Sequence, residues 1–325
     1  MITLGSIIVM TKNLGLNSSK YNKFVDFVRS LDTPIYIVPH VGMCYDAISS
    51  GLGLKRVLSD LSIESKLCLK LEYGPAFPQN IALARDISLE TMIADPQDIK
   101  QRSTVILVDT HIRTKQNGHD YYIKAFPAAF IDHHPLSSDE RSLMKRKKIG
   151  YYDLRETASC ASMICGYIKQ SGIHLDKSNG DDVVLATALY AGILVDTNKF
   201  TVNKDISLEL KFASMLTKIA DLDMINEFAN RKYPPELLNI IGSKKDSDIL
   251  TAGRYRIKIV NLDSLGFELT PQLISAGVDI FTQFGDTSIN ILLGFSYKDK
   301  KAIIKARSSD KAYPVSEELK KLFGG

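Results

Sequence analysis

The sequence has few cysteines and no long apolar run. Its four cysteines, Cys44, Cys68, Cys160 and Cys165, lack the paired spacing of a zinc motif and form no disulfide framework. A reducing compartment is therefore favoured. The apolar run at 2–10 is short and has neither a basic leader nor a small-residue cleavage pattern. We therefore predict no signal peptide and no membrane span, and expect a soluble cytoplasmic protein.

Internal repeats and low-complexity segments are also lacking, which excludes repeat arrays and disordered linkers as the main organisation. The chain has 325 residues, of which 45% are hydrophobic and 24% charged. This composition predicts packed cores, and the length favours two domains of about 150 residues each. We place the boundary so that 1–228 form the first domain, including a linker helix, and 229–325 form the second.

Basic and acidic residues balance over most of the chain. The segment 231–325 has 15 Lys and Arg against 11 Asp and Glu, whereas 1–230 has 26 of each, so the whole net charge of +4 lies in the C-terminal part. A basic bias there is compatible with a phosphate-bearing ligand and equally with an ordinary solvated surface.

Short apolar runs alternate with helical patterns along the first domain. Buried strands are predicted at 35–38, 67–71, 104–108 and 125–131, and a long apolar helix is predicted at 181–194. This alternation favours an α/β fold with a doubly wound, mostly parallel sheet. In the second, smaller α/β domain we predict strands at 255–261, 278–284, 288–297 and 301–306, and a helix at 269–276.

Acidic and imidazole side chains recur where these elements end. The clearest case is Asp132-His133-His134, directly after the apolar run 128–131; the others are His40, Asp46, Asp109 and Asp196. In an open α/β sheet the carboxyl ends of the strands line the ligand-binding edge. Oxygen and imidazole ligands suit Mn²⁺, Mg²⁺, Fe or Zn²⁺. The alternative is a set of solvated turns and helix N-caps, and four separate elements ending in this way weigh against it.

Nearly the whole chain resembles the DHH phosphoesterases, specifically the two-domain type shared by nanoRNases, cyclic-dinucleotide phosphodiesterases and RecJ-like nucleases. The order and spacing of four motifs make the resemblance specific. The motifs are 39–50, Val108-Asp109, 131–135 and 192–200.

The resemblance implies two divalent ions, usually Mn²⁺, about 3.5–4 Å apart at a site for phosphodiester hydrolysis. One site would use His40, Cys44 and Asp109, and the other Asp46, Asp109, His133 and Asp196. Catalytic roles would fall to His134, as a contact to the scissile phosphate, and to Asp132, which would orient a neighbouring imidazole.

Cys44 is a departure, because the family has Asp at that position. A thiolate suits Zn²⁺ better than Mn²⁺, and a neutral thiol removes one negative charge from a site for a dication. The resemblance therefore implies one complete metal site and one weakened site.

The second domain resembles the DHH-associated substrate-binding domain, with 278–284 matching its opening strand. Arg307 and Ser308 stand where that domain has an Arg-Ser pair facing the substrate. Gly324 and Gly325 resemble the beginning of its glycine-rich turn, whose further glycines and histidine are not in this sequence. The substrate contacts implied are Arg307, Ser308, Gly324 and Gly325.

Two functions follow from the resemblance. The first is a metal-dependent phosphodiesterase or exonuclease acting on short single-stranded nucleic acid or dinucleotides, with activity impaired by Cys44. The second is a catalytically degenerate RecJ-like subunit of a replication complex, which would bind GINS-type proteins, the helicase or single-stranded DNA. A homodimer is compatible with both. The sequence leaves open the choice of RNA, DNA or cyclic dinucleotide, and the polarity.

Overall fold

The structure is a computed structural model. It describes residues 15–40, 44–68, 93–94, 98–110, 125, 127–147, 149–202, 204–229, 240, 242, 249–266, 271–282, 288–308, 315 and 319. The chain forms two compact units, with the described residues up to 229 in the first and those from 240 onward in the second. The predicted glycine contacts Gly324 and Gly325 lie outside the described residues.

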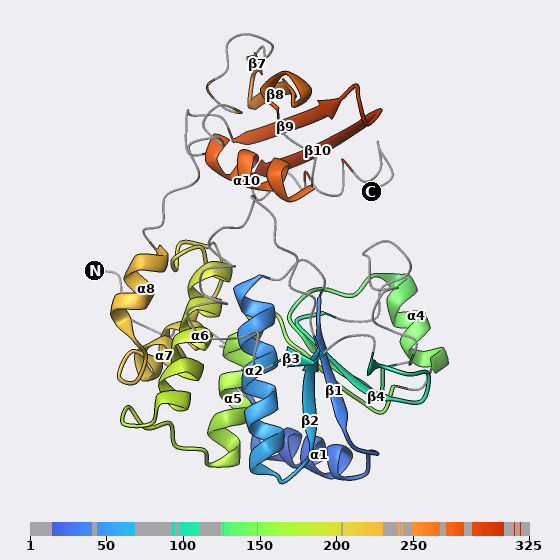
Figure 1. The fold of residues 1–325 in the computed structure, drawn as a ribbon, viewed down its shortest axis with the longest axis vertical. Coiled ribbons are helices and arrows are strands. Elements are labelled where there is room, and N and C mark those ends of the chain that lie inside the picture. Colours follow the sequence, from blue (N-terminus) through green and yellow to red (C-terminus); the bar gives the residue numbers. More distant parts are fainter. Residues whose placement is uncertain are drawn as a thin grey trace, which may run out of the picture. The chain divides into compact units, whose positions relative to one another are not determined.

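The first unit is built on a parallel sheet (Figure 1). Its strands follow the order β3-β2-β1-β4-β5-β6, and every pairing between neighbours is parallel. Their bounds are β1 Ile35–Pro39, β2 Ser65–Cys68, β3 Ile93–Ala94, β4 Thr104–Val108, β5 Ala129–Asp132 and β6 Tyr151–Leu154. The predicted α/β class and parallel sheet are confirmed.

Helices cover both faces of this sheet because successive strand residues point to opposite sides. On β1, Ile35 and Ile37 join one buried cluster, whereas Tyr36 and Val38 join another. The first cluster lies under α1 Ser18–Arg29, α2 Tyr45–Asp60, α5 Cys160–Ser171, α6 Gly180–Asp196, α7 Ser207–Leu216 and α8 Leu222–Ala229. The second is covered by α4 Ser138–Lys147. The sheet is therefore doubly wound.

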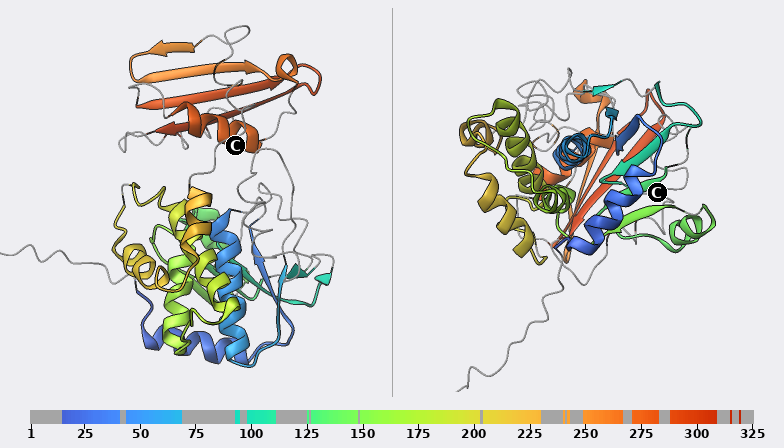
Figure 2. Two further views of the ribbon diagram at one scale, coloured as in Figure 1. Left: turned by 60° about the vertical axis from the view of Figure 1, so that its left-hand side comes forward. Right: turned by 90° about the horizontal axis from the view of Figure 1, so that it is seen from below.

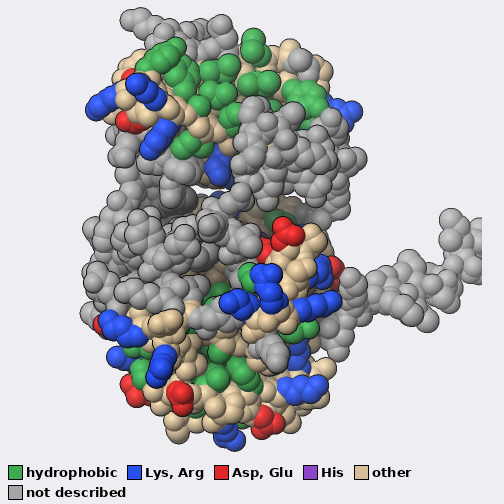
Figure 3. Space-filling view, turned by 90° about the vertical axis from the view of Figure 1, so that its right-hand side faces the viewer, with side chains coloured by type: hydrophobic (Ala, Val, Ile, Leu, Met, Phe, Trp, Pro, Cys, Tyr) green, Lys and Arg blue, Asp and Glu red, His purple; other side chains and the backbone are tan. Residues whose placement is uncertain are grey.

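Helix α4 was not predicted, because none of its residues is buried and it lacks a strong apolar stripe. Its last turn contains Lys145, Arg146 and Lys147. Basic side chains lie on the surface of the first unit, as Figure 3 shows. Across the described parts of the chain, no helix is both long and apolar enough to cross a bilayer.

The second unit is a four-stranded mixed sheet with a helix on one face (Figure 2). The strand order is β10-β9-β8-β7; β8 and β9 are parallel, and the other two pairs are antiparallel. The elements are β7 Ile249–Ala252, β8 Tyr255–Asn261, a 3₁₀ turn Asp263–Leu265, α10 Pro271–Phe281, β9 Ile289–Ser296 and β10 Lys301–Ser308.

The strand predicted at 278–284 is wrong, since its described part through Phe281 belongs to α10. The alternating run Val278-Asp279-Ile280 resembles a strand locally. However, Pro271 is well suited to the first helical position, and Leu273, Ile274 and Val278 then pack into one buried cluster. Tertiary packing decides against the local β propensity.

Candidate metal centre

Three neighbouring strands deliver polar residues to the same edge of the first sheet. The register pairs Pro39 with Val108 and Val108 with Ile131, so β1, β4 and β5 end side by side. His40 follows β1, Asp109 follows β4, and Asp132 is the last residue of β5. Parallel strands therefore bring together side chains that are far apart in the sequence, as the strand ends predicted.

His40, Cys44 and Asp109 form the first group. His40 Nε2 lies 3.1 Å from Cys44 Sγ and 3.4 Å from Asp109 Oδ2, and Cys44 Sγ lies 3.4 Å from the same oxygen. Cys44 is also the N-cap of α2, because its sulfur accepts a hydrogen bond from the amide of Ala47 at 3.3 Å. The helix start thus fixes where the thiol lies.

His133 is the centre of the second group. Its Nε2 lies 3.4 Å from Asp196 Oδ2, 3.7 Å from Asp46 Oδ2 and 3.4 Å from Asp109 Oδ1. Asp46 comes from the first turn of α2, and Asp196 is the last residue of α6. Asp109 thus presents one carboxylate oxygen to each group, which is the geometry of a bridging ligand.

The N-terminus of α5 fixes the carboxylate of Asp46. The amide of Cys160 donates to Asp46 Oδ2 at 2.6 Å, and the amide of Ala161 donates to Oδ1 at 2.6 Å. A helix N-terminus favours an anion, so this contact holds the carboxylate of Asp46 in place. Burial and the neighbouring carboxylates of Asp109 and Asp196 nevertheless raise the pKa of Asp46 well above its ordinary value. Sequence reasoning missed this contact. The N-cap of α5 is Ser159, whose side chain accepts a hydrogen bond from the amide of Ser162.

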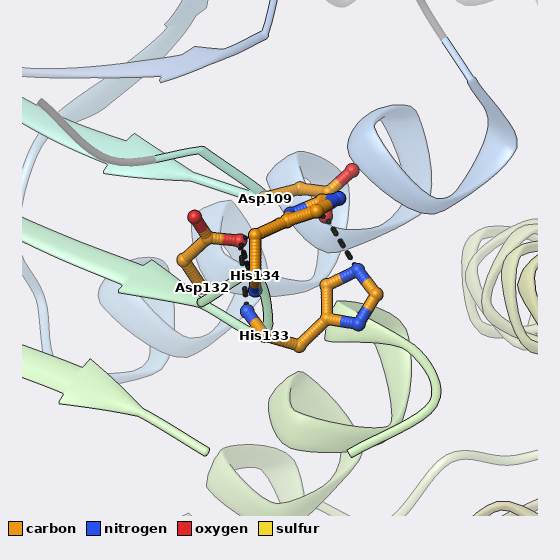
Figure 4. A group of neighbouring side chains, drawn as sticks. All are labelled: Asp109, Asp132, His133 and His134. Carbon is orange, nitrogen blue, oxygen red and sulfur yellow. Dashed lines mark hydrogen bonds and ion pairs between the residues drawn. The ribbon is translucent and has the colours of Figure 1, made fainter. Parts of the chain in front are cut away.

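Asp132 organises the two histidines that follow it, as Figure 4 shows. Its Oδ1 accepts hydrogen bonds from the amides of His133 at 2.8 Å and His134 at 3.2 Å, and from His134 Nδ1 at 2.8 Å. Asp132 is fully buried, whereas the His134 side chain is 40% exposed. Asp132 therefore fixes the ring of an accessible histidine.

Ionisation in the site reflects several acidic groups held close together. Burial acts to raise the pKa of Asp109, but the nearby imidazoles of His133 and His40 outweigh it and lower this pKa to about 2. Burial acts to lower the pKa of His133, yet the nearby carboxylates of Asp109 and Asp196 raise it well above the ordinary value. Burial and the carboxylates of Asp109, Asp196 and Asp46 raise the pKa of the Cys44 thiol.

The donor set fits divalent cations. Asp109 Oδ1 and His133 Nε2 are buried and have no hydrogen-bond partner, although buried polar atoms are nearly always paired. The described residues include three groups whose ligand atoms lie within 4.8 Å of one another: His40, Cys44 and Asp109; Asp46, His133 and Asp196; and Asp109, Asp132, His133 and His134. A cation would satisfy the unpaired atoms and relieve repulsion among the carboxylates.

Backbone strain marks the same region. Asp109 has a φ of 55°, and Asn198, Lys199 and Phe200, which follow Asp196, have φ values of 45°, 57° and 63°. Such values are uncommon for residues other than glycine and gather at functional sites. No signal in the sequence indicates this strain.

Gly192 gives the fourth motif a packing role beside the site. A Cβ at this position would overlap Ser49 Oγ and lie 3.2 Å from Asp46 Cα. We predict that Gly192→Ala lowers the free energy of unfolding by about 1–3 kcal/mol and weakens Mn²⁺ binding, because the backbone that carries Asp46 must shift. Thermal unfolding and calorimetric titration measure the two effects.

Gly180→Ala is the matched control, because Gly180 begins the same helix and a Cβ there meets nothing within 4 Å. This variant should retain full Mn²⁺ affinity and stability. Equal losses in the two variants would mean that the close approach of Gly192 to Asp46 is unimportant.

Arg307 and Ser308 lie on β10 of the second unit. Arg307 Nε donates to Asp279 Oδ1 at 2.6 Å and Nη2 donates to Ser275 Oγ at 3.1 Å, both on α10. The Arg307 and Asp279 side chains are 43% and 42% exposed. Arg307 is therefore oriented by α10 and still accessible.

The first unit is thus an α/β domain with carboxylates, imidazoles and a thiol at the carboxyl edge of a doubly wound sheet. Residues 34–193 match the model of the DHH family, N-terminal domain. This part of the chain is therefore a domain of the DHH family. A comparison with curated protein sequences found no match.

A solved structure shares the fold. The crystal structure of an exopolyphosphatase-related protein from Bacteroides fragilis matches with a TM-score of 0.73 at 17% identity, covering 95% of this chain and 88% of that chain. CDC45 from Entamoeba histolytica gives a TM-score of 0.43 at 11% identity, covering 95% and 91%. RecJ from Thermus thermophilus, in complex with Mn²⁺, gives a TM-score of 0.35 at 10% identity, covering 95% of this chain and 50% of that chain. The fold comparison depends on the first alone.

Proposed function

We propose that this chain is a metal-dependent phosphodiesterase that hydrolyses short single-stranded nucleic acid or dinucleotides. The supporting observation is the position of Asp109, whose two oxygens each lie in a different ligand group. The family depends on divalent metal ions, and the acidic and imidazole cluster has the matching chemistry. The match to the DHH family favours a phosphate ester as the group that is hydrolysed.

Asp46, Asp109, His133 and Asp196 would hold one Mn²⁺, and His40, Cys44 and Asp109 would hold the second. Bound divalent ions would supply charge neutralisation at the phosphate and a lowered pKa for water. The first set has three carboxylates and one imidazole, a hard and anionic donor set that suits Mn²⁺ or Mg²⁺. In the second set a neutral thiol replaces a carboxylate, so we expect weaker occupancy there.

His134 and Asp132 would act on the substrate side. The Nδ1 of His134 is bonded to Asp132 Oδ1, which leaves Nε2 as the atom that can donate to a phosphate oxygen when the ring is protonated. Asp132 would keep this ring oriented through its three hydrogen bonds and would not touch the substrate itself.

Arg307 would bind a substrate phosphate through its guanidinium, with Ser308 beside it. We predict that Arg307→Ala weakens binding of a short oligonucleotide or dinucleotide about tenfold, because a charge-assisted hydrogen bond contributes about 1.5–3 kcal/mol. The melting temperature should hardly change, since an exposed ion pair contributes little to stability. Fluorescence anisotropy and thermal unfolding measure the two quantities.

Asp279→Ala is the matched control for Arg307→Ala, because it breaks the same ion pair from the other side. It should leave binding intact or strengthen it. If both variants bind equally well, Arg307 makes no contact with the phosphate.

Cys44 favours a second candidate function, that of a catalytically inactive interaction protein. Burial and the carboxylates of Asp109, Asp196 and Asp46 raise the pKa of its thiol, and sulfur is a poorer ligand for Mn²⁺ than a carboxylate oxygen is. Such a protein could bind GINS-type replication proteins, a helicase or single-stranded DNA without hydrolysing it.

A hydrolysis assay separates the two candidates. Short single-stranded RNA, short single-stranded DNA and linear and cyclic dinucleotides are each incubated with the Mn²⁺-loaded protein, and matched samples contain chelator. The enzyme proposal expects slow, chelator-sensitive cleavage of at least one substrate. No cleavage of any of them, by the native chain or by Cys44→Asp, would leave only the interaction protein.

A further inference from the structure

One peptide group connects His133 to a buried acid outside the four motifs. His133 Nδ1 lies 3.2 Å from the carbonyl oxygen of Thr157, in the loop between β6 and α5. The amide of Ala158 donates to Glu209 Oε1 at 2.9 Å. The carbonyl of Thr157 and the amide of Ala158 belong to the same peptide group, so Glu209 and His133 bond to its two ends.

Glu209 is an unusual buried residue. It lies on α7, is fully buried, and its Oε1 is also 2.9 Å from Ser162 Oγ. Its second oxygen, Oε2, is buried and has no hydrogen-bond partner. Burial of a carboxylate with an unpaired oxygen is costly. A glutamine oxygen could accept the same two hydrogen bonds, so capping the start of α5 does not explain why an acid stands there.

We propose that Glu209 is a positioning residue of the metal centre that acts on His133 through the Thr157–Ala158 peptide. A carboxylate that accepts the Ala158 proton polarises the peptide and makes the Thr157 carbonyl a stronger acceptor. The stronger bond keeps a proton on Nδ1, which leaves Nε2 as the nitrogen that would bind an ion among Asp46, Asp109 and Asp196. Acceptors behind a metal-binding imidazole raise its basicity and fix its orientation in this way.

The inference depends on the proposed function only in treating His133 as a metal ligand. The contact between Glu209 and the peptide is a feature of the fold and does not require a bound ion. This difference makes the two ideas separable by experiment, because the state of His133 Nδ1 can be measured both with and without metal.

Glu209→Gln is the decisive variant, since it keeps the shape and an acceptor oxygen but removes the charge. We expect its melting temperature to be near that of the native chain. Its Mn²⁺ affinity should fall about tenfold, as is usual when a residue that orients a metal-binding histidine is removed. In ¹⁵N-histidine-labelled protein, the Nδ1 proton of His133, assigned by its loss in His133→Gln, should move upfield in Glu209→Gln even without metal.

Ser162→Ala is the control, because it removes the other donor to Glu209 Oε1 and leaves the carboxylate on the Ala158 amide. It should keep the native Mn²⁺ affinity and the native Nδ1 resonance. A purely structural role for Glu209 predicts instead that both variants lose stability and that neither moves the Nδ1 proton.

A further test uses the native chain alone and therefore does not depend on whether any variant folds. Addition of Mg²⁺ should shift the Ala158 amide proton together with the His133 Nδ1 proton, because one peptide joins them. A native Mn²⁺ affinity and an unmoved Nδ1 proton in Glu209→Gln, or an Ala158 amide unaffected by Mg²⁺ binding, would overturn the inference. Failure of the native chain to bind any metal would instead refute the proposed function, and the metal-free Nδ1 shift would still decide the role of Glu209.

Discussion

Replacing Cys44 with Asp should add a second tightly bound Mn²⁺ and raise the rate of phosphodiester hydrolysis by about 10²-fold or more. The position already lies 3.1 Å from His40 Nε2 and 3.4 Å from Asp109 Oδ2, measured from Sγ. A carboxylate there supplies the charge and the hard oxygen that the neutral thiol lacks. Asp is also a good N-cap, so the start of α2 should be preserved.

Cys44→Asn is the matched control, because an amide has the shape of Asp and can cap α2 but carries no charge. Elemental analysis after gel filtration should give about one Mn²⁺ per chain for the native protein and for Cys44→Asn, and about two for Cys44→Asp. An equal increase in rate for both variants would attribute the effect to shape. No increase for either would show that Cys44 does not limit the site.

Asp109→Ala should abolish Mn²⁺ binding more completely than the loss of any other single ligand, because Asp109 is the one carboxylate shared by both groups. Asn is the more conservative replacement, since it tolerates the left-handed backbone at this position better than Ala does. We expect both variants to lose more than about 10²-fold in affinity, because the loss of a buried, charge-bearing ligand costs several kcal/mol. Calorimetric titration with Mn²⁺ measures the loss.

Asp196→Asn provides the comparison for Asp109, since Asp196 belongs only to the group centred on His133. It should weaken binding at that group alone and leave the residual weak binding of His40, Cys44 and Asp109. If Asp109→Asn still bound Mn²⁺ at the native stoichiometry, the assignment of Asp109 as a shared ligand would be wrong.

The sequence predicted the part of the site that depends on strand ends. His40, Asp109 and Asp132 directly follow or complete apolar runs, and parallel strands bring such residues to one edge of a sheet. Asp46 and Asp196 also stood out as acids near element ends, but only the family resemblance placed them in one metal site, because both lie on helices whose packing on the sheet no local pattern reveals. Gly192, which permits that packing, became meaningful only with Asp46 beside it.

Backbone groups account for most of what sequence reasoning missed. The amides of Cys160 and Ala161 that hold Asp46, and the carbonyl of Thr157 that faces His133, leave no signature in side-chain chemistry. Glu209 could not be found either, because a single acid in an amphipathic helix ordinarily indicates a solvated face. These contacts arise from tertiary packing between segments that are distant in the sequence.

Anomalous scattering at the manganese edge, from crystals of the native chain grown with Mn²⁺, tests the inequality of the two groups most directly. A strong peak is expected among Asp46, Asp109, His133 and Asp196, and a weak peak or none beside His40 and Cys44. Crystals of Cys44→Asp should show both peaks. Two equally strong peaks in the native chain, or no peak at either group, would contradict this account.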